Sequence, residues 1–222
     1  MSEGKTLTIE TEKGGVGALL DAPADPAFVY LLAHGAGAGM RHPFLQTIAE
    51  GLVSRGAAVL RYQFPYMEAR KNRVDSPEVA AGTVMAAARR AVELVPGVPI
   101  IAGGKSFGGR MTSEAQSREP LPGVDGLAFL GFPLHPPGAP GTTRAEHLQR
   151  VQVPMLFLQG TRDAFAQLDL LRPMVAGLGD SASLVLTNDG DHSFNVRKSS
   201  GQSTAQAVQA LCDAIVSWAG QL

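Results

Sequence analysis

Short apolar segments alternate along the chain with longer segments in which apolar residues recur at helical spacing. Most of the short segments are apolar throughout, which is typical of parallel strands that helices cover on both faces. The longer segments predict the helices that connect these strands. The strands are expected at residues 28–33, 57–62, 98–102, 127–130, 155–158 and 184–186, and the helices at residues 43–55, 77–94, 107–117, 167–177 and 203–219.

Two earlier segments, residues 6–11 and 16–20, predict a hairpin at one edge of the sheet, with Gly14 and Gly15 in its turn. The expected total is therefore about eight strands, of which the last six or so run parallel. The predicted fold is of the α/β class, with a mostly parallel, twisted sheet and helices on both faces. The Pro- and Gly-rich stretch at residues 133–141 is interpreted as a long surface loop rather than as a linker between domains.

Length and composition favour one α/β domain that spans residues 1–222. The chain has 222 residues, of which 45% are hydrophobic, and this is enough to bury a large core. The stretch between the strands expected at residues 127–130 and 155–158 is too short to hold a helical cap. We therefore expect a single domain without a cap domain.

Charge and cysteine content exclude several classes of function. The net charge is -1 and no dense stripe of Lys and Arg occurs, so neither nucleic acid nor an acidic membrane is an expected partner. The start, MSEGKTLTIE, lacks the apolar core of a signal peptide, and no segment approaches the length of a membrane span, which predicts a soluble cytoplasmic protein. Cys212 is the one cysteine, so an internal disulfide and a multi-cysteine metal site are excluded; its neighbours predict a buried helix face.

A glycine-flanked serine follows one of the predicted strands. Residues 100–111 read IIAGGKSFGGRM, with Ser106 between Gly104 and Gly108 and a helix-compatible stretch after it. This is the layout of a nucleophile elbow, in which a strained turn exposes the serine hydroxyl and the flanking glycines remove the Cβ atoms that would collide. The pattern is weak by itself, because glycine and serine are common in this chain, so other strand ends must support it.

Polar residues follow three further predicted strands. The strand at residues 28–33 is followed by HGAGAG, residues 34–39; the strand at 155–158 is followed by Asp163; and the strand at 184–186 is followed by Asp189, Asp191 and His192. The carboxyl ends of parallel strands meet at one edge of a sheet, where ligands bind in folds of this kind. A small-residue loop, a serine, an aspartate and a histidine are therefore expected to converge there.

With these motifs the chain resembles the α/β-hydrolase superfamily over essentially its whole length. The order Ser106, Asp163, His192 matches the order of the family's catalytic residues, and each follows a strand. HGAGAG, GGKSFGGR and DHSFNVRKSSG are similar to a small, lidless bacterial branch that is related to dienelactone hydrolases and to a subunit of the nuclear NSL histone-acetyltransferase complex. Serine stands where true dienelactone hydrolases carry a cysteine nucleophile, which puts their substrate, though not the reaction class, in doubt.

The residue types predict the chemistry of acyl transfer. Ser106 is a weak nucleophile until a base takes its proton, and His192 is the expected base. Asp163 is expected to hold the imidazole in its productive tautomer. The resemblance implies that the oxyanion is bound by the backbone N–H groups of Phe107 and Ala36, with that of Gly37 as the fallback.

Each assignment has a structural alternative. Ser106 could be an ordinary helix N-cap. Asp189 and Asp191 compete with Asp163, because they are closer to the histidine in sequence. Among the other histidines, His34 is expected to shape the glycine loop, whereas His42, His135 and His147 are expected on the surface or in loops. Lys105 is expected to extend to a different side of the turn from Ser106, and is given no catalytic role.

Two further features remain open between function and structure. The loop at residues 66–75, YMEARKNRVD, follows a predicted strand, and its cations Arg70, Lys71 and Arg73 could meet an anionic substrate. The alternative is a solvated loop whose charge Glu68 and Asp75 partly offset. Several phenylalanines near strand ends could line an acyl pocket or could pack in the core: Phe44, Phe64, Phe107, Phe132 and Phe165.

The sequence therefore predicts a serine hydrolase that cleaves a carboxylic ester or thioester of small to medium size through an acyl-enzyme. The alternative is a catalytically silent α/β-hydrolase-like module that binds protein partners. The expected partner is a small-molecule substrate, and the sequence names no protein partner. No HExxH or comparable spacing occurs, so neither a metal nor another cofactor is expected.

Overall fold

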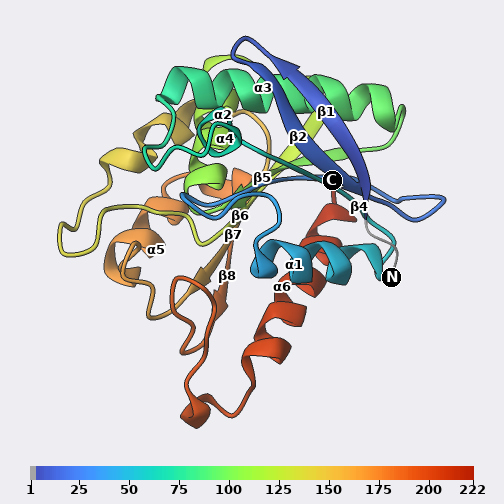
Figure 1. Ribbon diagram of the computed structural model, residues 1–222. Helices are drawn as coiled ribbons and strands as arrows, with labels where there is room; N and C mark the ends of the chain where they lie inside the picture. The colour runs from blue at the N-terminus through green and yellow to red at the C-terminus, as the bar shows by residue number, and fades with distance from the viewer. Residues whose placement is uncertain (1–3) are drawn as a thin grey trace.

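An eight-stranded sheet forms the centre of the computed structural model, which describes residues 4–222 (Figure 1). The strands lie in the order β1-β2-β4-β3-β5-β6-β7-β8. Strand β2 pairs antiparallel with both β1 and β4, and the six strands from β3 to β8 run parallel to one another. The strands are β1 (Lys5–Thr11), β2 (Gly14–Asp21), β3 (Val29–Ala33), β4 (Ala58–Tyr62), β5 (Ile100–Lys105), β6 (Val124–Leu130), β7 (Met155–Gly160) and β8 (Ala182–Thr187).

Helices cover both faces of this sheet. One face packs against α1 and α6, whose buried residues join one apolar cluster, and the other face packs against α3, α4, α5 and η1, whose buried residues join a second cluster. The helices are α1 (Pro43–Val53), α2 (Pro65–Glu68), α3 (Pro77–Leu94), α4 (Phe107–Arg118), α5 (Leu168–Ala176) and α6 (Thr204–Ala219), with short 3-10 helices η1 (Thr143–Arg150), η2 (Gly179–Ser181) and η3 (Lys198–Ser200). This arrangement confirms the predicted fold.

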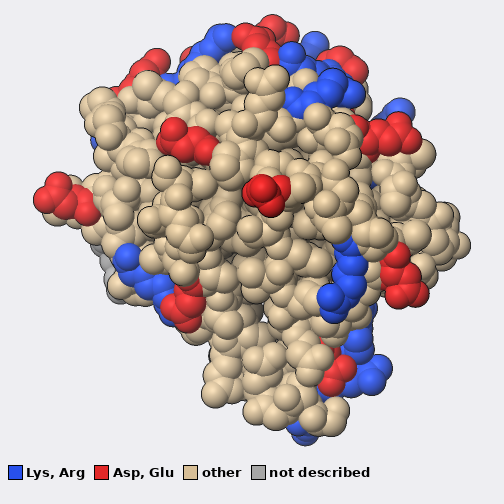
Figure 2. Space-filling view, turned by 180° about the vertical axis from the view of Figure 1, so that it is seen from behind, with Lys and Arg blue, Asp and Glu red and all other residues tan. Residues whose placement is uncertain are grey.

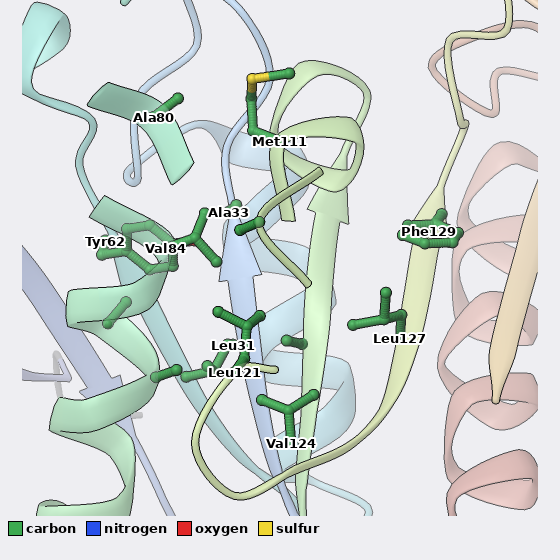
Figure 3. Close-up of a cluster of buried hydrophobic side chains, with 14 of the residues drawn as sticks. Leu31, Ala33, Tyr62, Ala80, Val84, Met111, Leu121, Val124, Leu127 and Phe129 are labelled. Carbon is green, nitrogen blue, oxygen red and sulfur yellow. The ribbon is translucent and has the colours of Figure 1, made fainter. Parts of the chain in front are cut away.

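The burial of each strand follows its place in the sheet. All residues of the inner strands β3, β4, β5 and β7 are buried, in agreement with their apolar sequences. Strand β8 is an edge strand, and its exposure alternates along the chain. Figure 3 shows how the second cluster fills the space between the sheet and the helices α3 and α4, with these side chains labelled: Leu31, Ala33, Tyr62, Ala80, Val84, Met111, Leu121, Val124, Leu127 and Phe129.

Local sequence signals set the ends of several helices. Ser76 accepts a hydrogen bond from the amide of Val79 and caps α3, which begins at a proline. Ser203 and Gln206 form a capping box at the start of α6. These signals explain why the predicted start of each of these helices agrees with the structure to within one residue.

Several predicted boundaries differ from the structure, and two of the differences involve glycines. The hairpin turns at residues 12–13, and Gly14, with φ +99°, already belongs to β2. Strand β5 runs two glycines further than predicted and ends at Lys105. A Cβ on Gly103 would collide with the carbonyl oxygen of Ala128, and a Cβ on Gly104 with that of Ala33, so these glycines allow neighbouring strands to approach closely.

The loop predicted at residues 133–141 is irregular, but its first residues, Leu134 and His135, are buried rather than on the surface. In the part of the chain that the structure describes, no helix is long and apolar enough to cross a membrane. Figure 2 shows one face of the molecule, on which cationic and anionic side chains are scattered over a mostly uncharged surface.

Candidate active site

Ser106 occupies the turn between β5 and α4 in a conformation that few non-glycine residues adopt. Its φ is +51° and its ψ is -114°. A Cβ on Gly108 would lie 2.6 Å from the carbonyl oxygen of His34, so the turn packs tightly against the loop that follows β3. Ser106 is the N-cap residue of α4 by position, but its side chain makes no capping hydrogen bond. The strained backbone therefore directs the hydroxyl away from the helix, so that it is available to other groups.

The hydroxyl of Ser106 begins a chain of two hydrogen bonds. Nε2 of His192 lies 2.9 Å from Oγ of Ser106, and Nδ1 of the same ring lies 2.7 Å from Oδ2 of Asp163. The three residues follow β5, β8 and β7, so the predicted convergence of strand ends brings them together. In the neutral imidazole that suits both bonds, Nδ1 carries the hydrogen and Nε2 accepts from the serine hydroxyl.

Asp163 is buried and fully occupied with donors. Its side chain is inaccessible to solvent, whereas that of His192 is 20% exposed. Besides the imidazole, Oδ2 accepts from Nε2 of Gln159 at 2.5 Å, and Oδ1 accepts from the amide of Phe165 at 2.7 Å. The ring of Phe165 lies 4.3 Å from the imidazole, tilted by 32°. These contacts fix both the carboxylate and the ring that it orients.

The two competing aspartates have other partners. Oδ1 of Asp191 accepts from the amides of Ser193 and Asn195, at 2.8 and 2.9 Å, and so winds the turn that carries His192. The carbonyl oxygen of Asp189 accepts from Nε of Arg162 at 2.9 Å, and its φ is +55°. Asp163 is therefore the aspartate that contacts the imidazole, as the sequence predicts.

Two of the three predicted oxyanion donors are free. Within residues 4–222, the amides of Ala36 and Phe107 donate to no protein acceptor. A Cβ on Gly35 would lie 3.9 Å from Cβ of Ser106, so the glycine loop adjoins the serine. The amide of Gly37 is occupied, because it donates to the hydroxyl of Tyr66 at 2.9 Å. This bond removes Gly37 from the set of available donors, and sequence reasoning missed the role of Tyr66.

His34 shapes the glycine loop, as predicted. Its ring is fully buried, Nδ1 donates to the carbonyl oxygen of Gly35 at 2.8 Å, and Nε2 accepts from the amide of Phe64 at 3.1 Å. Burial lowers the pKa of His34 to about 4. The ring is therefore neutral near pH 7 and joins the loop after β3 to the segment after β4.

His135 lies in a loop, as expected, whereas the expectation for His147 was wrong, because it lies in η1; both residues are buried, with exposures of 2% and 9%. Nε2 of His147 lies 2.7 Å from Oγ of Ser113, so η1 is tied to α4 by a second Ser–His pair. Ser113 is fully buried, which excludes a substrate from its hydroxyl. His135 Nε2 accepts from the amide of Gln167. Both histidines connect elements of the fold.

Lys105 is a buried cation beside the site. Its residue exposure is 8%, and its Nζ has no hydrogen-bond partner among the described residues. Burial lowers the pKa of Lys105 to about 8, although the carboxylates of Asp163 and Asp191 act in the opposite direction. The signal in the sequence was a single charged residue at the end of the otherwise apolar run IIAGG.

The basic loop keeps its three cations exposed. The two acids that were expected to offset them bind backbone amides instead: Oε2 of Glu68 accepts from the amide of Gly17 at 3.0 Å, and Oδ2 of Asp75 accepts from the amide of Tyr66 at 3.1 Å.

Among the phenylalanines, Phe64 and Phe132 are fully buried, whereas Phe44, Phe107 and Phe165 are partly exposed. Within the described residues, no group of three His, Cys, Asp or Glu side chains could hold a metal ion.

Comparison with known proteins agrees with this fold. A family model described as an alpha/beta hydrolase domain matches residues 26–220. An alpha-beta serine hydrolase homologue from Coxiella burnetii is similar in structure, with 16% identity, a TM-score of 0.78, and coverage of 97% of this chain and 99% of that one. A dienelactone hydrolase from Anabaena variabilis has 19% identity, a TM-score of 0.77, and coverage of 97% and 96%.

A lidless α/β serine hydrolase from Xanthomonas campestris is a third neighbour, with 19% identity, a TM-score of 0.74, and coverage of 98% of this chain and 96% of that one. At these identities the structures share the fold. The resemblance to the superfamily and to dienelactone hydrolases is confirmed, whereas that to the NSL complex subunit stays a prediction. Since the family model spans residues 26–220, most of the sequence, the chain belongs to the α/β hydrolase family.

Proposed function

We propose that this protein is a serine hydrolase that cleaves a carboxylic ester or thioester of small to medium size through an acyl-enzyme. Ser106 is the nucleophile, His192 the general base and Asp163 the acid that orients it. One observation carries the proposal: two hydrogen bonds, of 2.9 and 2.7 Å, link the strained serine through the imidazole to a buried carboxylate. A serine without such a base is a poor nucleophile at neutral pH.

In the proposed reaction, Oγ of Ser106 attacks the carbonyl carbon while Nε2 of His192 takes its proton. The amides of Ala36 and Phe107 bind the oxyanion that forms. The imidazolium, stabilised by Asp163, then returns its proton to the leaving alcohol or thiol, and the acyl group stays on the serine. A water molecule, activated by the same imidazole, releases the acid in the second half of the reaction.

An open site supports a small or medium substrate. The connection between β6 and β7, residues 131–154, holds one helix, η1, and Leu148 of η1 is buried in the core. We therefore propose that residues 1–222 act as one domain without a cap domain. The lidless serine hydrolase from Xanthomonas campestris is a neighbour of this kind. The cytoplasmic location stays a prediction from the sequence.

The proposal is tested by labelling with a fluorophosphonate probe and measuring the intact mass. The probe is expected to add one equivalent, and Ser106→Ala is expected to abolish the addition without unfolding the protein. Ser113→Ala is the matched control, because Ser113 also lies 2.7 Å from a histidine but is fully buried, so this variant is expected to label normally. If the wild type stays unlabelled under conditions that label a known serine hydrolase, the protein-binding module becomes the better interpretation.

A further inference from the structure

The ammonium group of Lys105 and the ring of His192 meet at Gly131. A Cβ on Gly131 would lie 3.1 Å from Nζ of Lys105, 3.3 Å from the carbonyl oxygen of His192 and 3.5 Å from Cε1 of its ring. Lys105 is the last residue of β5, so the residue that precedes the nucleophile in the chain also adjoins the base. Gly131, with φ +71°, leaves the space in which these groups meet.

Two carboxylates attract this ammonium without forming a hydrogen bond to it among the described residues. Asp163, in the loop after β7, and Asp191, in the segment after β8, both favour the charged form of Lys105. In the loop after β3, Gly35 adjoins the side chain of Lys105, and the preceding His34 is neutral near pH 7 because burial lowers its pKa to about 4. The ring of Phe194, also after β8, lies with its centroid 5.9 Å from Nζ. The positive charge thus lies near the ring of His192 and is favoured by the carboxylates of Asp163 and Asp191.

A buried ammonium without a hydrogen bond destabilises a fold, and a methionine of similar length would avoid that cost. The same charge has a clear benefit beside Asp163, whose carboxylate is buried. A nearby cation lowers the free energy of such a carboxylate in a medium of low dielectric constant. Lys105 therefore offers an advantage to the site rather than to the stability of the fold.

We propose that Lys105 is a positioning residue of the hydrolase site: its positive charge, which meets the ring and the carbonyl oxygen of His192 at Gly131, keeps the segment that carries His192 in register with Ser106. This inference rests on the proposed function. Loss of the charge removes its attraction to Asp163 and Asp191, but it also removes the larger cost of burying the ammonium, so the fold is expected to lose no stability. The imidazole then aligns less well with the serine hydroxyl.

The charge of Lys105 is present below about pH 8, where its pKa lies, and is lost above that value. The kcat/KM of the wild type on a p-nitrophenyl ester is therefore expected to fall by about tenfold as the pH rises through this value. Lys105→Met is expected to be about tenfold slower at pH 7 and to lack this alkaline decline. The ratio of the kcat/KM of the wild type to that of Lys105→Met is therefore expected to fall toward one at alkaline pH. A general loss of structure in the variant would not produce this change.

The experiment compares the wild type, Lys105→Met and the control Lys198→Met, in which an exposed lysine of η3 is replaced. The Tm of Lys105→Met is expected to equal or exceed that of the wild type, and Lys198→Met is expected to change neither Tm nor the pH profile. A parallel pH profile of Lys105→Met and wild type would overturn the proposal. So would a lower Tm of Lys105→Met, which would make Lys105 a structural residue.

A spectroscopic readout separates this inference from the proposed function. The Nδ1 proton of His192, hydrogen-bonded to Asp163, gives a low-field proton resonance. It is expected to be sharp in the wild type below pH 8, to broaden above it, and to be broad in Lys105→Met at all pH values. If the wild type hydrolyses no ester and takes up no fluorophosphonate, the hydrolase proposal fails, and the resonance still decides whether Lys105 holds the imidazole. Identical resonances in the wild type and in Lys105→Met would overturn the proposal that Lys105 positions the imidazole.

Discussion

Nδ1 of His192 lies 2.7 Å from Oδ2 of Asp163, a residue 29 positions earlier in the chain, whereas the adjacent Asp191 accepts from amides of its own turn. The division follows from the fold. A residue after the neighbouring parallel strand faces the same rim as the histidine, while a neighbour in one tight turn is used to close that turn. One aspartate orients the ring and the other shapes the loop that carries it.

Replacement of these two aspartates is expected to separate the two roles. In Asp163→Asn, an amide hydrogen can face Nδ1 and favour the wrong imidazole tautomer, so kcat is expected to fall by several decades, on the order of 10⁴. In Asp191→Asn, the side-chain oxygen can still accept from Ser193 and Asn195, so kcat is expected to change little. The kcat of both variants on one ester, measured at steady state, distinguishes the two roles. A crippled Asp191→Asn with a nearly normal Asp163→Asn would show that the acid has been misassigned.

The hydroxyl of Tyr66 anchors the glycine loop through the amide of Gly37, next to the free amide of Ala36. Tyr66→Phe is expected to loosen this loop and to lower kcat by about three- to tenfold, because the oxyanion donor is less well placed. The expected loss of stability is about 1 kcal/mol, as for a typical hydrogen bond. Measured kcat and urea unfolding check both effects.

Tyr30→Phe is the matched control for that variant. The hydroxyl of Tyr30 donates to the carbonyl oxygen of Ala128 at 2.8 Å inside the core. Its removal is expected to cost a similar free energy of unfolding while kcat stays unchanged. Equal losses of kcat in the two variants would show that the effect of Tyr66 comes from general stability.

Acid is expected to destabilise the fold through two buried histidines. Burial lowers the pKa of both His34 and His147 to about 4, whereas the unfolded value lies near 6.5. The unfolded chain therefore binds more protons, and stability is lost as the pH falls from 6.5 to 4. Each histidine contributes at most roughly 3 kcal/mol to this loss. Urea unfolding between pH 4.5 and 7 measures the slope, which His147→Phe should reduce to about half. An unchanged slope in that variant would exclude His147 as a source.

Much of the site could be predicted from the sequence because parallel strands bring their carboxyl ends to one edge. Ser106, Asp163 and His192 each follow an apolar run that forms a strand of the sheet. A correct prediction of each strand therefore also predicts where the polar residue after it lies. The tight turn at Ser106 could also be predicted, since few residues other than glycine tolerate the close approach of strands there.

The remaining features depend on contacts that no local pattern encodes. His147 lies in η1, a 3-10 helix without a clear helical period, and its burial follows from the pairing with Ser113 on α4. The occupied amide of Gly37 depends on a tyrosine 29 residues away. Lys105 was visible as a charged residue in an apolar run, but its neighbours Asp191 and Gly131 come from other strand ends, and only the folded chain brings them together.

Substrate size provides the last prediction, and it rests on the open rim. Residues 131–154 contribute only η1 between β6 and β7, so within the described chain this connection builds no helical cap over Ser106. Phe107 follows Ser106 in the sequence, and the ring of Phe165 packs on the imidazole of His192. Both phenylalanines are partly exposed and can cover the first carbons of an acyl chain. Each buried methylene contributes about 0.8 kcal/mol, whereas carbons beyond the rim stay in water and contribute little.

The kcat/KM on p-nitrophenyl esters is therefore expected to rise from acetate to butyrate and to flatten or fall by octanoate. Phe165→Ala is expected to reduce the gain from acetate to butyrate, although it also removes the ring that packs on His192, so the comparison uses the ratio of the two esters within each protein. That ratio cancels any change in the base, because the base serves both substrates alike. A kcat/KM that climbs steadily through dodecanoate would require a deep acyl tunnel and would contradict the open site.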